Sequence, residues 1–587
     1  MKVATQLFAC PQCRLARPRA VTRTITRTSR PLLTPRPITR FYTISNTNPN
    51  STSPSSSSGP NSRGEADPKQ TQQTQQTQQT TQQPQRPTTA PRPNIDIKHI
   101  RQNPELYEKN CLERNYKVQA TYPSRINALF AQWQARQKDG RGLRERSNAL
   151  RRQIANPATI QHEDEAEDSS AGGSRQDGSQ TSDPASHPLG DGARKDVRSM
   201  TKDELLEEAR VIKQALSAIE EDEARLSAEM TELALAIPNL TSEDTPRGDE
   251  PRVLSYINEP HPLKSASPPS DRVWRSHVHI GSELGILDFA GAATTSGWGW
   301  YYLLDEGAQL EQALISYALA SMTRIPGWRQ VAPPSIVYSH IAAACGFQPR
   351  DQNGETQIYA LTQSASDAAR GRPELSLAGT AEIPLAGMRA DSVLEAAELP
   401  SKRVAVSRCY RAEAGARGAD TKGLYRVHEF TKVELFAWTA PDADATADVF
   451  DEMVDAQTDI LSSLGLHCRV LEMPSTDLGA SALRKIDIEA FFPSRAAQGL
   501  NDGWGEVTSA SVCADYQTRR LATRARGEDA KLTYPWTVNG TALAVPRVLA
   551  AILENGWDEA QMAVTIPECL RPWMNGKEKI EMKHRQN

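Results

Sequence analysis

The sequence has few aromatic residues, few cysteines and no long apolar run. Phe, Trp and Tyr make up 6% of its 587 residues. No stretch reaches about eighteen apolar residues, so we expect no transmembrane helix and no membrane partner. The eight cysteines include one C-x-x-C pair, Cys10 and Cys13, which lacks the paired spacing of a zinc ribbon. Cys345, Cys409 and Cys513 are expected to be small buried residues in a reducing compartment.

Acidic residues are absent from the start of the chain. Residues 1–50 contain eight arginines, one lysine and no Asp or Glu, and the first acidic residue is Glu65. Because they also lack the apolar core of a secretory signal, this composition predicts a mitochondrial transit peptide over residues 1–43. The alternative is a disordered basic tail that contacts nucleic acid. Residues 44–93 are rich in Ser, Gln, Thr and Pro, which predicts a disordered linker.

Length and net charge limit the remainder of the chain. A chain of 587 residues is too long for one hydrophobic core, and length alone predicts about three or four structural units. The formal net charge is -4, and loss of the basic leader would make the rest more acidic still. Binding to RNA would therefore depend on local basic patches rather than on the overall charge.

Two strand-like runs within residues 404–438 flank a loop that contains three glycines. Because side chains alternate along a strand, Arg411 and Glu413 project together from the first run, and Phe430 and Glu434 share a face of the second. A cation, two carboxylates and a ring suit a nucleotide with its α-phosphate on arginine, its adenine on the ring and its amine on a carboxylate. The alternative is a hairpin with ion pairs on its solvated side.

Five segments in order resemble one enzyme family. R-x-E at 411–413, the glycine loop and R-x-H-E-F-x-K-x-E at 426–434 resemble motif 2 of the class II aminoacyl-tRNA synthetases, in the form found in seryl-tRNA synthetases. Residues 307–334 resemble motif 1, a long helix and a strand that usually build the dimer interface. The resemblance covers residues 94–573 apart from one insertion, and five segments in the family order make coincidence improbable.

The other segments supply the remaining motifs. Residues 537–555 resemble motif 3, with a strand, a turn at Asn539, Gly540 and Thr541, and a helix that carries Arg547. Thr380 to Glu382 is similar to the family's serine-binding TAE, and residues 506–509 are similar to its ATP and metal segment. Motif 3 departs from the pattern at Ala542, where glycine is commoner, and at Pro546. A proline deep in the helix would re-aim Arg547, whereas one in the first turn is tolerated.

Apolar residues recur every seven positions before the motifs, which predicts a coiled-coil helix. One series is Leu205, Ile212, Ile219, Leu226 and Leu233, and a second, interrupted by Glu223, is Ala209, Leu216, Met230 and Ile237. The expected partner is 122–155, weakened locally by Gly140 and Gly142. Without context such a pair favours a dimerisation strut. The resemblance implies an antiparallel arm that holds the long variable arm of tRNA-Ser through shape and backbone charge, with residues 157–198 as a disordered insertion.

The resemblance implies a reaction in two steps. The serine carboxylate attacks the α-phosphate of ATP to give seryl-adenylate, and a terminal ribose hydroxyl of the tRNA then takes the acyl group. A carboxylate is already ionised at pH 7, so the first step depends on placement and charge neutralisation. The implied catalytic residues are Arg411, which holds the α-phosphate and the serine carboxylate, and Arg547, which reaches the γ-phosphate.

The other site residues follow from the same resemblance. Adenine would stack on Phe430 and its amine would donate to Glu413, while Arg426 would bind the pyrophosphate side. Mg²⁺ would lie on Glu506 and Ser509, since hard oxygen ligands suit that ion. The implied serine-binding residues are Thr380, Glu382, Arg411, Glu434, Asn539 and Thr541. A site that hydrogen-bonds the serine hydroxyl would reject alanine.

The expected fold is α+β, a class II antiparallel sheet flanked by helices and preceded by an antiparallel helical coiled-coil arm. The arm would span residues 94–240 and the catalytic domain residues 241–587. A homodimer that uses ATP, Mg²⁺, L-serine and tRNA-Ser in the mitochondrial matrix is the leading hypothesis. One alternative is a non-catalytic paralogue that acts as a binding or structural protein. Another is the same enzyme class with a different amino acid, although the arm and the TAE segment favour serine.

Overall fold

The structure is a computed structural model. It describes residues 90–156, 196–259, 275–347, 357–412, 423–527 and 529–582. All of these fall within one compact unit, Pro87–Asn587. The predicted transit peptide, all but the last four residues of the predicted linker, Glu413, and the insertion up to residue 195 lie outside the described residues.

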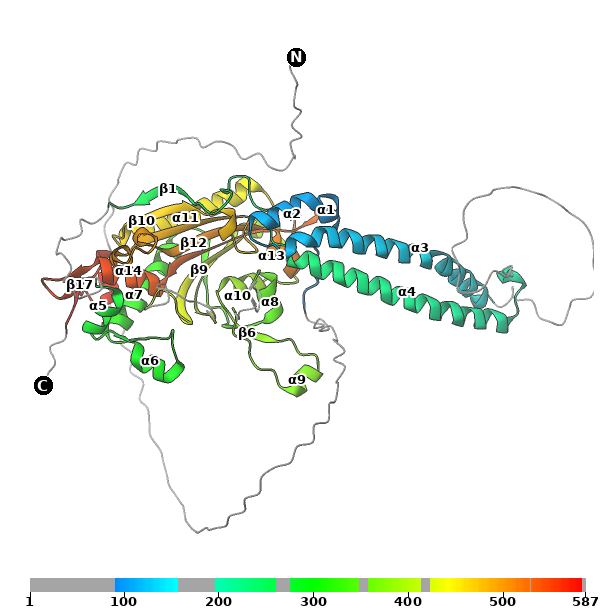
Figure 1. The fold of residues 1–587 in the computed structure, drawn as a ribbon, viewed down its shortest axis with the longest axis horizontal. Helices are drawn as coiled ribbons and strands as arrows, with labels where there is room; N and C mark the ends of the chain where they lie inside the picture. Colours follow the sequence, from blue (N-terminus) through cyan, green and yellow to red (C-terminus); the bar gives the residue numbers. More distant parts are fainter. Residues whose placement is uncertain are drawn as a thin grey trace, which may run out of the picture. The chain divides into compact units, whose positions relative to one another are not determined.

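An eight-stranded sheet organises the larger part of the described chain (Figure 1). In spatial order its strands are β1 (Arg252–Ile257), β10 (Cys468–Glu472), β11 (Arg484–Phe491), β12 (Trp504–Ala514), β15 (Trp536–Ala544), β9 (Glu429–Thr439), β8 (Ser401–Tyr410) and β4 (Trp328–Val331). Neighbouring strands are antiparallel except β4 and β8, which are parallel. The predicted α+β class with an antiparallel sheet is therefore confirmed, with one parallel pair at an edge.

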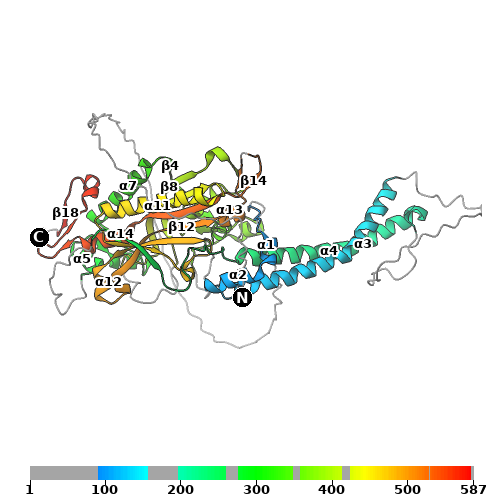
Figure 2. The same ribbon diagram turned by 90° about the horizontal axis from the view of Figure 1, so that it is seen from above.

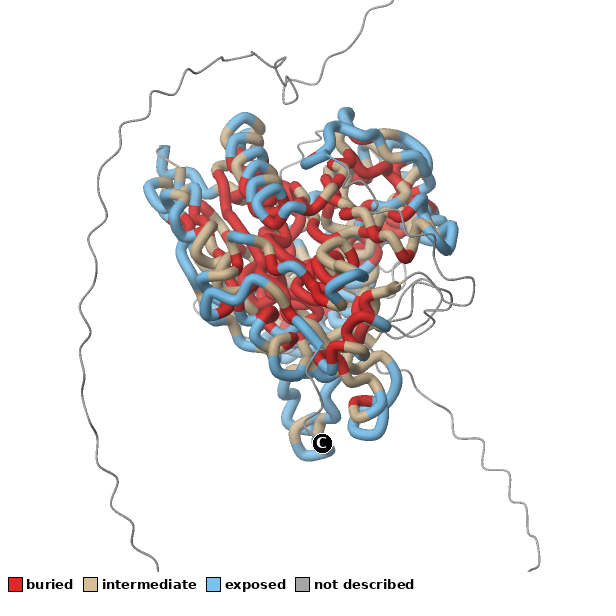
Figure 3. Tube along the Cα trace, turned by 90° about the vertical axis from the view of Figure 1, so that its left-hand side faces the viewer, coloured by how far each residue is buried: buried red, intermediate tan, exposed pale blue. Residues whose placement is uncertain are grey.

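The two faces of this sheet differ because side chains alternate along each strand. One face is apolar and packs against α7 (Glu306–Arg324), α11 (Ala443–Ser463) and α14 (Val545–Asn555). Val433, Leu435 and Ile488 are fully buried there, and Figure 3 shows buried residues gathered in the interior with exposed segments around them. The alternate positions carry polar side chains to the opposite face.

Shorter elements complete this part of the molecule. The helices are α5 (His277–Glu283), α6 (Phe289–Ser296), α8 (Ser339–Ala344), α9 (Ala365–Ala369), α10 (Glu382–Gly387), α12 (Pro493–Ala497) and α13 (Tyr516–Leu521). Two small sheets have two strands each, β2 (Leu287–Asp288) with β3 (Tyr302–Leu303) and β5 (Ile336–Tyr338) with β6 (Leu375–Leu377). Two have three strands each, β14 (Leu532–Thr533), β13 (Arg524–Arg526) and β7 (Val393–Glu395), and β16 (Trp557–Asp558), β17 (Ala563–Thr565) and β18 (Lys579–Glu581).

Two long helices, α3 (Tyr122–Ala155) and α4 (Lys202–Ala236), run side by side in both views (Figures 1 and 2). They follow α1 (Ile97–Gln102) and α2 (Pro104–Glu113). Ion pairs of Arg125 with Glu229 and of Arg146 with Glu208 show that they are antiparallel. The bounds of α3 agree with the prediction, and the seven-residue series of α4 lies along the contact.

Gly140 and Glu223, which interrupt the predicted coiled-coil pattern, each make a specific contact between the two helices. Helix α3 continues through Gly140, where a Cβ would lie 2.9 Å from Arg144 Nη1 and 3.3 Å from Ile219 Cγ2. Glycine therefore lets α4 and a guanidinium approach the backbone of α3 closely. Glu223, which interrupts the second series, accepts hydrogen bonds from Arg144 Nη2 at 2.7 and 2.9 Å.

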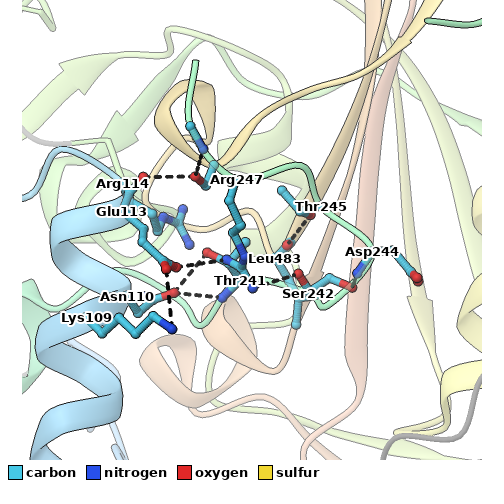
Figure 4. Close-up of polar contacts among 12 residues, drawn as sticks. Lys109, Asn110, Glu113, Arg114, Thr241, Ser242, Asp244, Thr245, Arg247 and Leu483 are labelled. Carbon is cyan, nitrogen blue, oxygen red and sulfur yellow. Dashed lines mark hydrogen bonds and ion pairs between the residues drawn. The ribbon is translucent and has the colours of Figure 1, made fainter. Parts of the chain in front are cut away.

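A buried polar joint attaches the helical pair to the sheet domain. Arg114, which follows α2, donates from Nη1 to the Asn239 carbonyl at 2.5 Å and from Nη2 to the Gly479 carbonyl. Asn110 donates to the same Asn239 carbonyl at 3.0 Å, and its Oδ1 accepts from the amide and hydroxyl of Thr241, both at 2.9 Å (Figure 4). Asn239 follows α4 and Gly479 lies between β10 and β11, so one guanidinium ties the arm to the sheet.

Helix α13 forms a second attachment for the arm. Arg520 Nη2 donates to the carbonyls of Leu235 and Ile237 at 3.1 and 3.3 Å. These carbonyls belong to the end of α4, where the helix leaves them without intrahelical partners. The carbonyl of Arg519 accepts from the amide of Asn94 at 2.9 Å, at the start of the arm. The same short helix therefore holds both chain segments at the base of the arm.

Two predictions about local structure are wrong. Asn539, Gly540 and Thr541 do not form a turn, because they lie within β15 and pair with β9 and β12. A Cβ at Gly540 would lie 2.4 Å from Met453 Sδ of α11, so glycine here permits close packing of a helix on the strand. The predicted disorder through residue 198 also fails at its end, since Val197–Ser199 forms a 3-10 helix (η3) beside buried Met200.

In the part of the chain that the structure describes, no helix combines the length and the apolar character needed to cross a bilayer.

Candidate active site

Polar side chains from four neighbouring strands lie on the sheet face opposite α7, α11 and α14. They are Lys485 and Asp487 on β11, Glu506 and Ser509 on β12, Asn539 and Thr541 on β15, and Lys432 and Glu434 on β9, with Phe430 beside them. The strand register places Thr541 opposite Glu434 and Asp487 opposite Ser509. Strands far apart in the sequence therefore assemble one charged surface.

A pocket on this face brings most of the predicted nucleotide-binding residues together. Its lining includes Arg411, Arg426, Phe430, Lys432, Glu506, Ser509, Thr541 and Arg547. Glu413, predicted to accept from the adenine amine, lies outside the described residues. The predicted serine-binding residues Thr380, Glu382, Glu434 and Asn539 do not line this pocket, and hydrogen bonds place them next to it.

Arg411 and Phe430, which stand on either side of the motif 2 loop in the sequence, lie close together. The guanidinium carbon of Arg411 lies 5.3 Å from the centre of the Phe430 ring, within the range of a cation–π contact. Strand pairing continues past the end of β8, because the Arg411 amide donates to the His428 carbonyl at 2.9 Å. His428 Nδ1 also lies 3.0 Å from the Arg411 carbonyl. The predicted juxtaposition of cation and ring is therefore present.

Arg547 points into the same pocket from the first turn of α14. The helix begins at Val545 and Pro546 occupies its start, where a missing N–H has no intrahelical acceptor to lose. Arg547 Nη1 donates to the carboxylate and to the carbonyl of Glu506, both at 3.0 Å, and Nε donates to the Tyr425 carbonyl at 3.0 Å. Pro546 therefore does not turn Arg547 away from the site.

Glu506 is held as an anion by its surroundings. Burial alone would raise the pKa of Glu506, but the cations Arg547, Lys485 and Arg411 outweigh burial and lower that pKa to about 2. Ionised Glu506 and the Ser509 hydroxyl offer the hard oxygen donors that suit Mg²⁺. In the described part of the chain no group of three or more His, Cys, Asp or Glu forms a metal site. An ion here would therefore take further oxygens from bound phosphates and water.

The predicted serine residues form a buried cluster beside the pocket. Thr380 Oγ1 donates to Glu434 Oε2 at 3.0 Å, and Lys432 Nζ lies 2.5 Å from the same oxygen. Gln517 Nε2 donates to Glu382 Oε1 at 2.5 Å. Lys432 lines the nucleotide pocket and also contacts Glu434, so it connects the two groups of residues.

Glu382 has an unusual electrostatic environment. Burial is the main cause that raises the pKa of Glu382, and the nearby Glu434 carboxylate adds to it. Lys432 and hydrogen bonds from Gln517 and Asn539 lower the pKa but do not cancel these effects, and the result is a pKa of about 7. With a pKa of about 7, a substantial fraction of Glu382 is protonated near neutral pH.

Several contributors to this site were not assigned roles from the sequence. Lys432 stands two residues before Glu434, so strand alternation was a usable signal for its position on the same face. Lys485 pairs with the buried Asp487 at 2.7 Å. The alternation of charged residues with isoleucine on β11 is a weaker signal for their position. Gln517 had no local signal, because only the fold brings α13 to Glu382.

A larger cavity of about 480 Å³ adjoins the pocket and shares Tyr425 with it. Its walls include Phe289, Trp298, Trp300 and Phe492. None of the predicted site residues lines this cavity, whose polar side chains include Arg495 and the bonded pair His277 and Glu554. The charged set therefore marks the smaller pocket as the candidate active site.

Known proteins resemble this chain in sequence and in fold. Residues 365–556 match the family described as tRNA synthetase class II core domain (G, H, P, S and T). The chain is 45% identical over 360 residues to the mitochondrial serine–tRNA ligase of Saccharomyces cerevisiae, across 61% of this chain and 75% of that protein. It is 35% identical over 483 residues to the mitochondrial serine–tRNA ligase of Schizosaccharomyces pombe, across 82% of this chain and 88% of that protein.

A solved structure gives the same result. The crystal structure of seryl-tRNA synthetase from Pyrococcus horikoshii complexed with ATP superposes with a TM-score of 0.66 and 29% sequence identity. The superposition covers 84% of this chain and 100% of that chain. With the motifs assembled on one sheet face, these relatives show that the chain belongs to the seryl-tRNA synthetase family of class II aminoacyl-tRNA synthetases.

Proposed function

We propose that this serine–tRNA ligase forms seryl-adenylate in the pocket between motifs 2 and 3 and transfers the seryl group to tRNA-Ser in the mitochondrial matrix. The main support for the proposal is that the residues of the nucleotide pocket adjoin the buried residues expected to bind serine. Arg411, Phe430 and Arg547 line one pocket, and the buried Thr380 and Glu434 lie next to it. Such a junction would allow an amino acid to lie against the α-phosphate of ATP.

Arg411 is the residue that aligns the two reactants. Its guanidinium carries donors for both the serine carboxylate and the α-phosphate. A carboxylate oxygen forms a bond to the α-phosphorus while the bond to the bridging oxygen of the β-phosphate breaks, and pyrophosphate leaves. Adenine stacks on Phe430, Arg426 binds the pyrophosphate side, and Arg547 holds the γ-phosphate. These cations neutralise charge that develops in the transition state.

Mg²⁺ fits the oxygen donors of Glu506 and Ser509. When bound, the ion would neutralise phosphate charge and act as a Lewis acid toward the phosphates. Glu506 already carries its negative charge near neutral pH, because Arg547 and Lys485 stabilise the anion. Arg547 would then share its hydrogen bonds between Glu506 and the nucleotide. The adenine-amine contact of Glu413 remains a prediction.

The buried cluster beside Arg411 supports recognition of serine. Glu382 and Thr380 would receive the ammonium, and Asn539 holds Glu382 through a hydrogen bond. Glu434 and Thr541 face one another across paired strands and would bond the serine hydroxyl. Because these groups would stay unpaired against alanine, the site favours a hydroxyl-bearing substrate.

Residues 94–240 are proposed to bind tRNA-Ser and residues 241–587 to carry catalysis. The two long helices differ in charge: α3 has eight basic and two acidic residues, whereas α4 has four basic and ten acidic residues. Phosphate contacts should therefore come mainly from α3. We also infer a homodimer through motif 1, because α7 leads to β4 at an edge of the sheet and an unpaired edge is available to a second copy.

Import into mitochondria is proposed from two independent observations. Residues 1–50 are basic and lack acidic residues, which is typical of a transit peptide. The similar proteins of Saccharomyces cerevisiae and Schizosaccharomyces pombe are mitochondrial serine–tRNA ligases. A non-catalytic paralogue is disfavoured, because charged residues without a role in catalysis would not be expected to converge on one pocket.

The test of this function is exchange of labelled pyrophosphate into ATP by the purified full-length protein. Serine should support exchange, and alanine should do so about 10⁴-fold less well because the hydroxyl-binding groups are left unpaired. Threonine and glycine complete the panel. Exchange with another amino acid in preference to serine would contradict the assignment, and absence of exchange with all four would revive the non-catalytic alternative.

The raised pKa of Glu382 predicts that KM for serine depends on pH. Serine binding through its ammonium requires the Glu382 carboxylate, and its pKa of about 7 lies above the usual value of a glutamate. KM for serine should therefore rise by about tenfold for each pH unit below about 7 and level off above it. Pyrophosphate exchange between pH 5.5 and 8.5, a range of about three pH units, measures this.

Glu382→Gln provides the control for the pH prediction. Glutamine is nearly isosteric and does not titrate, so this variant should have a raised KM for serine without the break near neutral pH. A break that persists in Glu382→Gln would assign the titration to another group. A KM that stays constant in the wild-type protein would mean that Glu382 is ionised at neutral pH without serine.

A further inference from the structure

A buried histidine and a buried glutamate join three segments in the wall of the larger cavity, next to the nucleotide pocket. His277 begins α5 and Glu554 lies in the last turn of α14, and both are buried. His277 Nδ1 lies 2.8 Å from Glu554 Oε1, and the His277 amide donates to the same oxygen at 3.1 Å. The Ser494 hydroxyl and amide donate to Glu554 at 2.8 and 3.1 Å.

The other ring nitrogen of His277 fixes the end of the motif 2 loop. The Leu424 amide donates to His277 Nε2 at 3.0 Å. A backbone amide can only donate, so Nε2 carries no proton and Nδ1–H must donate to Glu554. The glutamate thus selects the tautomer that accepts from Leu424. Both partners lie within the interior, since Leu424 is fully buried.

The approach of the imidazole requires glycine at the preceding position. Gly423 has φ +72°, a left-handed conformation, and a Cβ there would lie 2.2 Å from His277 Nε2. The backbone after Leu424 leads directly into the active site. The Tyr425 carbonyl accepts from Arg547 Nε at 3.0 Å, and its ring lies 4.7 Å from the guanidinium carbon of Arg547.

Both ends of helix α14 therefore contribute a side chain to one hydrogen-bond network. Arg547 in its first turn binds Tyr425, and Glu554 in its last turn binds the histidine that holds Leu424. We propose that His277 is a positioning residue for ATP binding: through Leu424 it sets Tyr425, and through Tyr425 it sets Arg547 toward the γ-phosphate. The inference rests on the proposed role of this pocket as the ATP site and adds to it a residue that no motif contains.

Two substitutions at His277 separate its two hydrogen bonds. In His277→Asn the side-chain amide can replace the Nδ1 donor to Glu554, but it cannot reach Leu424. In His277→Gln the longer side chain places an oxygen near the position of Nε2, where it can accept from Leu424. We expect His277→Asn to raise KM for ATP by about tenfold, because a buried amide is left unpaired. KM for serine should change by less than about twofold.

The conservative variant and a neighbouring histidine supply the controls. His277→Gln should restore KM for ATP to within about threefold of the wild-type value. His279→Asn changes an exposed histidine two residues along the same helix and should leave both KM values unchanged. The measurements are pyrophosphate exchange in full-length protein, direct ATP binding by titration calorimetry, and thermal unfolding.

The outcomes distinguish the inference from the proposed function. Equal KM values for ATP in His277→Asn and His277→Gln, or an equal rise in KM for serine, would overturn the positioning role and leave a purely structural one. A wild-type protein that binds ATP without catalysing exchange would contradict the proposed activity, while calorimetry on the two variants would still decide the role of His277. A wild-type protein that does not bind ATP would overturn both.

Discussion

Substitution of Arg411 or Arg547 by alanine is expected to abolish serine-dependent pyrophosphate exchange while the protein stays folded. Each guanidinium would lose contact with phosphate charge that develops during the reaction, and removal of one such donor costs about 10²- to 10³-fold in kcat or more. Arg547→Ala also removes the partner that lies 3.0 Å from Glu506. Exchange assays at saturating ATP and serine measure the loss.

A matched arginine shortly before Arg411 in the chain controls for charge and expression. Arg408 lies on β8 three residues before Arg411, is partly exposed, and forms ion pairs with Glu311 and Glu429 outside the pocket. Arg408→Ala should retain exchange within about threefold of the wild-type value, since partly exposed ion pairs contribute little. Near-normal exchange by a folded Arg411→Ala or Arg547→Ala protein would refute the role assigned to that residue.

Removal of the outer part of the helical arm should separate the two steps of the reaction. Arg136 and Asp222 face each other across α3 and α4, with an ion-pair distance of 3.3 Å. A short turn that joins them deletes residues 137–221 and spares the apolar cluster at the base of the arm, which contains Ile126, Leu226 and Leu233. Pyrophosphate exchange should stay within about threefold, whereas tRNA charging should fall by about 100-fold or more because phosphate contacts on α3 are lost.

A second deletion serves as the control for the arm. Residues 157–195 lie outside the described residues. Their excision should reduce tRNA charging much less, because a segment with few apolar residues cannot fold by burying apolar surface. Both proteins are assayed for pyrophosphate exchange and for charging of tRNA-Ser. An equal loss of both activities in the shortened arm would mean that the helices support the catalytic domain. Loss of charging on excision of 157–195 would make that segment an RNA contact.

Regular patterns made the arm and the sheet predictable. The repeat from Leu205 to Leu233 depends on neighbours along one helix, so periodicity predicts the helices, and the resemblance implied that they pair as an antiparallel arm. Arg411, Phe430 and Arg547 were placed in one site by the resemblance, and their meeting in one pocket follows from the order of β9, β12 and β15. Local sequence carries such information because helix and strand geometry are local.

Other features depend on contacts that no local pattern contains. The sequence predicts a turn at Gly540, yet this glycine accommodates Met453 of a helix about ninety residues earlier in the chain. His277 and Glu554 are separated by 277 positions, and neither belongs to a motif. Gln517 contacts Glu382 across 135 positions. Partners of this kind emerge only when the folded chain brings the elements together.

The ion pair of Arg144 and Glu223 is one of the contacts that fix how the two arm helices are aligned along their length. A purely apolar seam with a seven-residue repeat packs similarly after a slip of one repeat, which would displace one helix by about 10 Å relative to the other. Glu223 is only 12% exposed, so a slip that separated it from Arg144 would leave a largely buried charge without its partner. The residue that interrupts the repeat thereby disfavours alternative alignments of the two helices.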